Sequence, residues 1–114
     1  MDIQVKKGLL DYCVLRVLQT CDSYGYQMIR DLAPVVELSE STLYPILRRL
    51  EMAKEVDSYS VEHRGRLRRY YRITEAGQKR LRDFRLQIGQ IQTALSYIQG
   101  NGSPKEGPTG REEP

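Results

Sequence analysis

Apolar residues recur at helical spacing near the start of the chain. Across residues 4–20 they form one stripe, whose members are Leu10, Val14, Val17 and Leu18. Cys13 and Cys21 lie beside this stripe, and the wheel places Asp11, Arg16 and Gln19 elsewhere. The pattern predicts a first helix with one buried side.

Two more helices are predicted before residue 52. Asp22 and Ser23 are suitable caps for a helix from about Tyr24 to Ala33. Pro34 should end that helix, because a proline pushes the preceding residue out of the α region. Residues 38–51 predict a third helix, and its apolar side consists of Leu43, Ile46, Leu47 and Leu50.

The third helix has two candidate caps. Starting after Ser39 would let Leu38 and Leu43 form a hydrophobic staple, but Pro45 would then be the sixth helical residue and would remove an interior hydrogen bond. Starting after Ser41 would leave Pro45 breaking only the first such bond. Both starts predict an irregular first turn.

The periodicity changes from helical to alternating after Glu51. Residues 56–62 and 67–73 are rich in β-forming side chains with a period of two, and Gly65 in the intervening turn, residues 63–66, can take a positive φ. The pattern predicts a β-hairpin. Three helices followed by a hairpin are typical of a winged helix-turn-helix unit.

The last predicted helix has the most regular apolar pattern in the chain. Thr74 is a suitable cap, and Glu75 suits the positive end of the helix dipole. Apolar residues then follow at spacings of 3, 4, 3, 4 and 3, at Leu81, Phe84, Ile88, Ile91, Leu95 and Ile98. So narrow a seam favours helix–helix association, and we expect these residues to mediate dimerisation, with the partner's first helix also in contact.

Together these elements predict a mainly α fold with a small β-hairpin, of the α+β class. We divide the chain into a winged helix-turn-helix domain over residues 1–74, a C-terminal dimerisation helix over residues 75–99 and a disordered tail over residues 100–114. The tail holds no large apolar residue, so it cannot offset the entropy of ordering.

The distribution of charge points to a polyanionic partner. Residues 1–62 hold seven Lys or Arg against ten Asp or Glu, and residues 86–114 hold two against three. Residues 63–85 hold nine against two, a balance of +7, although the whole chain carries only +3. An asymmetry of this size suggests nucleic acid first and a membrane surface second. Because the arginines lie on a hairpin and not along an amphipathic helix, nucleic acid is favoured.

The third helix and the hairpin supply the candidate DNA contacts. Five arginines and no acid lie between His63 and Arg72, and like charges on one hairpin favour a neutralising phosphate backbone over a merely solvated surface. Arg48 could pair with a guanine edge, and Tyr44 could bind a phosphate. The full set of predicted DNA contacts is Ser41, Thr42, Tyr44, Arg48, Arg49, His63, Arg64, Arg66 and Arg68.

The sequence lacks the residues that metal-binding or enzymatic functions require. His63 is the only histidine, and two cysteines eight positions apart cannot form a zinc site, so we predict no metal, no cofactor and no enzymatic activity. Both cysteines are expected to be reduced packing residues. The longest apolar run near the N-terminus, residues 8–18, is too short and too charged for a signal peptide or membrane span, so we predict a cytoplasmic protein.

Three segments resemble the PadR family of winged-helix transcriptional regulators. They are Tyr24–Gln27 (YGYQ), Ser41–Glu51 (STLYPILRRLE) and Arg68–Gly77 (RRYYRITEAG), and the likeness extends over about residues 8–98. Ser41 stands where the family commonly has glycine. The short length and single C-terminal helix resemble the compact branch of the family.

The resemblance implies a homodimer that binds promoter DNA and usually represses transcription. Some members respond to aromatic or multidrug effectors bound between subunits through a tryptophan, which this chain lacks; Tyr12 and Tyr97 could stack on such a ligand instead. We therefore predict a sequence-specific DNA-binding regulator. The alternative is a winged-helix adaptor that binds another protein, which would show little salt dependence and no preference for duplex DNA.

Overall fold

The computed structural model describes residues 3–102, which contain four helices and one two-stranded antiparallel sheet. The elements are α1 (Ile3–Thr20), α2 (Gly25–Leu32), α3 (Glu40–Met52), β1 (Val56–His63), β2 (Arg66–Ile73) and α4 (Glu75–Ile98). This order confirms the predicted winged helix-turn-helix with a long C-terminal helix. Most of the predicted tail, residues 103–114, lies outside the described residues.

The first three helices pack around one apolar core in the first of two compact units, which ends at Leu81. All four expected residues of α3 are buried in it, and so are Leu10, Val14 and Leu18 of α1. Val17 and Cys13 are only partly buried, and Cys21 is exposed, so the expectation that both cysteines are packing residues holds only for Cys13. Burial raises the pKa of the Cys13 thiol.

Asp11 was placed on the wrong side of α1 by the sequence prediction. Its side chain is buried, with 7% exposure for the residue, and it lies on the same helical face as Val14, Leu15 and Leu18. The spacing of these four residues is i, i+3, i+4 and i+7, which defines one face of a helix. An acid on that face needs partners, and two arginines supply them, as described below.

The predicted caps of α2 do not cap it. Tyr24 occupies the N-cap position without a side-chain hydrogen bond, because Asp22 accepts a 2.6 Å hydrogen bond from the Tyr59 hydroxyl and Ser23 pairs with Tyr71 of β2. Ala33 keeps α-helical angles (φ −52°, ψ −41°) despite the following proline. The helix still ends there, since the amides of Val35 and Val36 both donate to the Leu32 carbonyl and close the chain into a turn.

Of the two candidate starts for α3, the structure has the earlier one. Ser39 is the N-cap, and its hydroxyl accepts a 3.3 Å hydrogen bond from the Thr42 amide. Leu38 and Leu43 are both buried, as a hydrophobic staple requires. Pro45 is consequently the sixth residue of the helix and cannot donate to the carbonyl four residues earlier.

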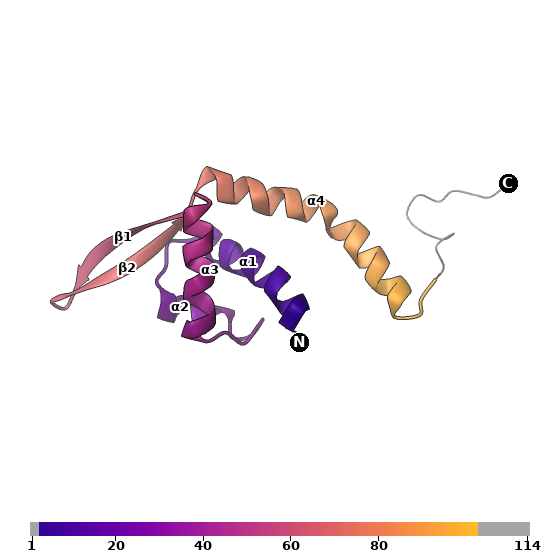
Figure 1. The fold of residues 1–114 in the computed structure, drawn as a ribbon, viewed down its shortest axis with the longest axis horizontal. Helices are drawn as coiled ribbons and strands as arrows, with labels where there is room; N and C mark the ends of the chain where they lie inside the picture. The colour runs from indigo at the N-terminus through magenta and orange to yellow at the C-terminus, as the bar shows by residue number, and fades with distance from the viewer. Residues whose placement is uncertain (1–2, 103–114) are drawn as a thin grey trace. The chain divides into compact units, whose positions relative to one another are not determined.

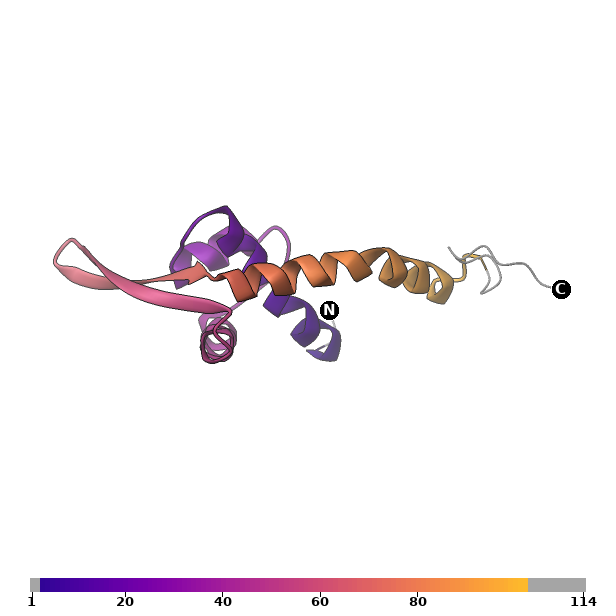
Figure 2. The same ribbon diagram turned by 90° about the horizontal axis from the view of Figure 1, so that it is seen from above.

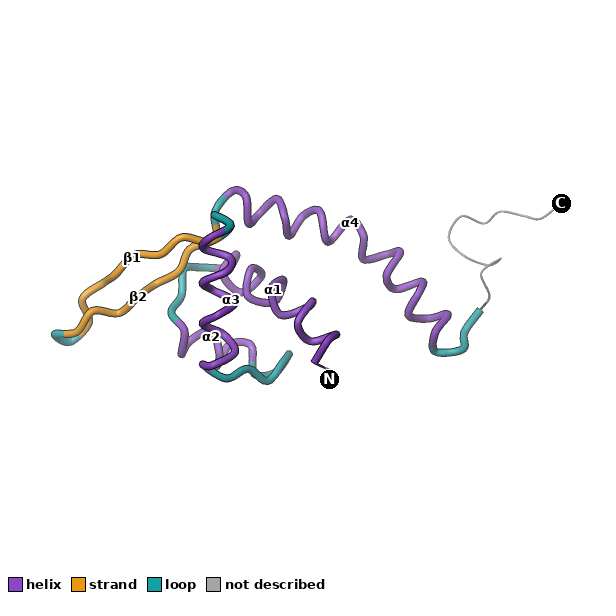
Figure 3. Tube along the Cα trace, viewed as in Figure 1, coloured by secondary structure: helices purple, strands orange, loops and turns teal. Residues whose placement is uncertain are grey.

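The hairpin extends away from the helices of its unit and ends in a two-residue turn (Figures 1 and 2). Arg64 and Gly65 form this turn, shown as a loop at the end of the strands in Figure 3, and both have positive φ, 52° and 80°. Positive φ at both central positions is typical of a type I′ turn, which matches the twist of the strands. The strands are therefore one residue longer at each side of the turn than predicted, and His63 pairs with Arg66.

The first turns of α4 belong to the same unit as the three helices. Thr74 caps α4 as predicted, accepting a 3.2 Å hydrogen bond from the Gly77 amide while its hydroxyl donates to the Lys54 carbonyl at 2.7 Å. Leu81 is 3% exposed and lies in the core of its own unit, so its burial is explained without a dimer partner. The compact unit thus continues past the predicted boundary at residue 74.

Gly77 offers a test of this docking. A β-carbon at this position would collide with the carbonyl oxygen of Glu55 and with the Ile73 side chain, whereas Gly89 on the same helix has open space around it. We expect Gly77→Ala to lower the free energy of unfolding by about 1–3 kcal/mol. The matched variant Gly89→Ala should be neutral or raise it by up to about 1 kcal/mol. Thermal or urea unfolding of both variants checks this, and equal stabilities would contradict it.

Candidate nucleic-acid interface

The exposed side of α3 carries all of its predicted DNA contacts. Ser41, Thr42, Tyr44, Arg48 and Arg49 are exposed. Near the start of the helix, the Ser41 and Thr42 hydroxyls each lie 3.1 Å from the Ser39 hydroxyl, so they form an exposed polar group around the N-cap.

Tyr44 is positioned by a close contact with α2. A β-carbon at Gly25 would collide with the Tyr44 hydroxyl and ring, so the tyrosine lies directly on the glycine at the first residue of α2. This explains why a buried glycine starts that helix. The contact sets the position of Tyr44 while leaving 39% of the residue exposed.

Arg49 forms an ion pair with another residue of the chain. Its Nη2 donates to Oδ1 of buried Asp11, and Arg80 of α4 donates to the other oxygen of the same carboxylate at 3.1 Å. Arg80 also donates to Glu55 at 2.8 Å, and its Cζ lies 5.0 Å from the centre of the Tyr12 ring. Burial alone would lower the pKa of Arg80, but hydrogen bonds to Glu55, Tyr12 and Asp11 raise it overall.

This network changes what the sequence suggested for two residues. Arg49 was predicted to contact DNA, but the structure gives its guanidinium a role in joining α3 to α1. Tyr12 was a candidate for stacking on a ligand, and it instead packs against Arg80. The sequence did not identify Asp11, Glu55 and Arg80 as members of a network. For Asp11 a usable signal was present, because this acid occurs at the helical spacing of the buried apolar residues.

Aromatic rings and arginines form a ladder on one face of the hairpin. Its successive members are Arg68, Tyr24, Tyr70, Tyr59 and Arg72, with neighbouring groups separated by 4.0, 5.4, 5.8 and 5.1 Å. Tyr24 comes from the segment before α2, so the ladder fastens the hairpin to the helices. The hydrogen bond to Asp22 is the main cause that raises the pKa of Tyr59.

Three of the five hairpin arginines have partners within the chain, and these partners lie outside the segment from His63 to Arg72. Arg69 pairs with Glu51 of α3 at 3.2 Å and Arg72 pairs with Asp57 across the strands at 3.0 Å, while Arg68 lies over Tyr24. The sequence could not reveal the Glu51 partner, because it comes from another element.

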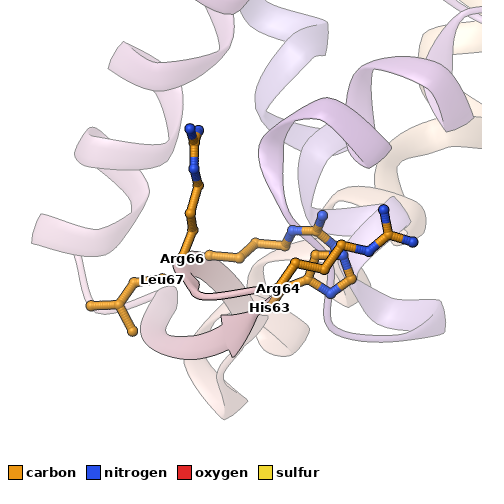
Figure 4. Close-up of a pocket in the computed structure, with 5 residues that line it drawn as sticks. His63, Arg64, Arg66 and Leu67 are labelled. Carbon is orange, nitrogen blue, oxygen red and sulfur yellow. The ribbon is translucent and has the colours of Figure 1, made fainter.

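The tip of the hairpin carries the remaining two arginines. Arg64 and Arg66 are exposed, and neither forms an ion pair with any described residue. Together with His63, Leu67 and Arg68 they line an open hollow of about 440 Å³. In Figure 4 the His63 and Arg64 side chains extend to one side of the tip and Leu67 to the other. Positive groups therefore gather on a projecting loop that is accessible to a polyanion.

A second polar hollow lies between α3 and β2. It has a volume of about 260 Å³ and is lined by Tyr44, Arg48, Glu51, Arg69 and Tyr71. Burial is the main cause that raises the pKa of Tyr71. Arg48 is exposed and, within residues 3–102, forms no ion pair. The hollow brings the exposed side of α3 next to the hairpin.

The described part of the chain offers no group of three or more His, Cys, Asp or Glu side chains that could hold a metal ion. None of its helices is long and apolar enough to cross a membrane.

Comparison with known proteins agrees with this architecture. The sequence profile of the transcriptional regulator PadR-like family matches residues 14–83. A Lysinibacillus sphaericus protein described only as "Uncharacterized protein X" is 32% identical over 98 residues, covering 81% of this chain and 89% of that protein.

Solved structures show the same fold. A Streptococcus mutans protein is 34% identical with a TM-score of 0.72, covering 83% of this chain and 91% of that one. A PadR family transcriptional regulator from Eggerthella lenta is 28% identical with a TM-score of 0.77, covering 88% of this chain and 89% of that one. With a family profile that spans more than half of its residues, the chain belongs to the PadR-like family of transcriptional regulators and is a DNA-binding regulator of transcription.

Proposed function

We propose that the protein represses transcription as a homodimer that places α3 in the major groove and the hairpin tip against the adjacent backbone or minor groove. The observation that carries this proposal is the distribution of unpaired arginines: Arg48 on α3 and Arg64 and Arg66 at the tip have no ion-pair partner among the described residues.

The arginine of α3 and the arginines of the hairpin tip have different roles in this proposal. Arg48 projects from the helix that would enter the groove, where an arginine can bind the O6 and N7 atoms of guanine. Arg64 and Arg66 lie on a projecting turn, with His63 and Arg68 beside them, and are suited to phosphates. Ser41, Thr42 and Tyr44 complete the proposed interface. Arg49 would support the position of α3 through Asp11 and not bind DNA itself.

The dimer would form through α4, in the second unit, which begins at Arg82. Along its predicted seam Phe84 and Ile88 are half-buried, and exposure rises through Ile91 (37%) and Leu95 (53%) to Ile98 (75%). Exposed apolar side chains at heptad spacing are suited to a second copy of the same helix. Duplication would present two copies of α3 to a palindromic operator.

The remaining parts of the proposal follow from the family. A single helix follows the hairpin within residues 3–102, as in the compact branch, and we assign no catalytic activity. A transcriptional regulator must be in the same compartment as the DNA, so we place the protein in the cytoplasm. An aromatic effector would stack on Tyr97, which is 52% exposed. The Tyr12 ring would be available to an effector only after leaving Arg80.

Fluorescence anisotropy with the DNA upstream of the protein's own gene tests the DNA interface. Affinity should fall steeply with salt. Arg48→Ala should cost about 1–3 kcal/mol on the preferred sequence and flatten sequence preference. Arg64→Ala should weaken all duplexes alike and reduce the salt slope by about 1.

Arg16→Ala is the matched control, since Arg16 is an exposed arginine of α1 outside the proposed interface. It should bind as the unaltered protein does. If the unaltered protein binds no duplex at low salt, the DNA interface is wrong; binding that is insensitive to salt and to Arg64→Ala would favour the protein adaptor.

Sedimentation tests the dimer. Replacing Ile88 and Ile91 with lysine should give monomers, because two charges would be buried in the seam of each copy. The control replaces Gln90 and Thr93 with lysine. At 100° per residue, these two positions lie on the other side of the helix, so the mass should stay that of the dimer. A dimer that persists in the first variant would show that the seam is not the interface.

A further inference from the structure

The hollow between α3 and β2 has the lining of an anion site. Arg48 and Arg69 contribute two positive charges and Glu51 one negative charge, so the net charge of the lining is +1. Tyr44 and Tyr71 add two phenol groups. Arginine forks and phenolic hydroxyls are donors to oxyanions, and α3 and β2 are the two elements assigned to DNA.

One lining residue, Arg69, already holds an oxyanion, the carboxylate of Glu51. Its Nη2 donates to both carboxylate oxygens, at 3.2 and 3.5 Å, which are long distances for a charge-assisted hydrogen bond. The Arg69 side chain is 58% exposed and that of Glu51 31%. An ion pair this exposed contributes little to stability, so Arg69 can exchange its partner at small cost.

Glu51 has a second contact that would survive such an exchange. The Ser58 hydroxyl donates a 2.6 Å hydrogen bond to Oε2 of Glu51, shorter than either contact with Arg69. The carboxylate would therefore keep its position when Arg69 turned away. It would remain a negative charge beside whatever anion Arg69 then bound.

We propose that this hollow binds one backbone phosphate of duplex DNA through Arg69 and Tyr44, and that Glu51 is an internal anion with which this phosphate competes. The inference rests on the proposed DNA interface and adds a contact that it does not contain. Arg48, which also lines the hollow but is exposed on α3, would remain available to the base edges. Glu51 weakens every duplex complex by a similar amount, and so lowers non-specific binding without altering sequence preference.

Free phosphate presents the same oxyanion as a DNA backbone. The position of the hollow favours the duplex as its ligand, because the hollow lies between α3 and the hairpin and a backbone that contacts both elements would pass over it. A free anion would gain nothing from that arrangement.

Glu51→Gln tests the competition directly. Glutamine keeps an oxygen acceptor for Ser58 but loses the charge that holds Arg69. Affinity for any duplex should rise by about fivefold to tenfold at low salt, and the slope of log Kd against log salt should steepen by about 1. Glu75→Gln removes the same charge from an exposed position at the start of α4, outside the hollow and the hairpin tip, and should change affinity by less than about twofold.

Arg69→Ala completes the cycle. In the original chain it should weaken all duplexes alike, and in the Glu51→Gln chain it should abolish most of the gain, because the two side chains act as one unit. The proposal is overturned if Glu51→Gln matches Glu75→Gln, or if the gain survives without Arg69. Should Glu51→Gln fail to fold, Arg69→Ala alone decides: a loss confined to one sequence, or no loss, overturns the proposal.

Two further comparisons distinguish failure of the proposed DNA interface from failure of the phosphate site, and a duplex ligand from a free anion. If the unaltered protein binds no duplex, the proposed DNA interface itself fails; if it binds and Glu51→Gln has no effect, only the phosphate site fails. Exchanging chloride for inorganic phosphate at equal ionic strength should leave the advantage of Glu51→Gln in place. Loss of that advantage in low millimolar phosphate would show a free-anion site and overturn the assignment to duplex DNA.

Discussion

The carboxylate of Asp11 is the constraint on which the first unit depends. It is buried among the apolar residues of α1 and receives Arg49 from α3 and Arg80 from α4. Because an unpaired buried carboxylate costs several kcal/mol, this face of α1 packs stably only when the charge is paired, and the two arginines provide that pairing. Arg80 extends the same network to Glu55, between α3 and β1. One buried charge thereby links α3, the base of the hairpin and the start of α4.

Within residues 48–80, this network and the aromatic ladder divide the arginines into two groups. Arg49, Arg68, Arg69, Arg72 and Arg80 contact acids or rings within the chain, whereas Arg48, Arg64 and Arg66 do not among the described residues. The +7 balance of residues 63–85 therefore overstates the charge that is free for a ligand. Part of the basic surface thus anchors the hairpin to the helices, and the arginines without such partners lie at the tip and on one side of α3, the two surfaces proposed to contact DNA.

Periodicity predicted the elements well because helices and strands are set by local spacing. The α3 core, the Thr74 cap and the family segments could all be read from neighbouring residues. The failed cap predictions have one cause, which is contact between residues distant in sequence: Asp22 and Ser23 bond to the hairpin instead of capping α2. The ion pair between Arg49 and Asp11 was not predicted for the same reason. The burial of Leu81 within its own unit was not predicted either, since the seam pattern does not show which core buries a residue.

Mapping the DNA contact surface by NMR tests the central claim most directly. Titrating a labelled sample with a short operator duplex should produce the largest amide shift changes in residues 39–48 of α3 and residues 63–68 of the hairpin tip. Residues 89–98 of α4 should change little. Unchanged resonances at α3 and the tip, or changes concentrated in residues 89–98, would contradict the account.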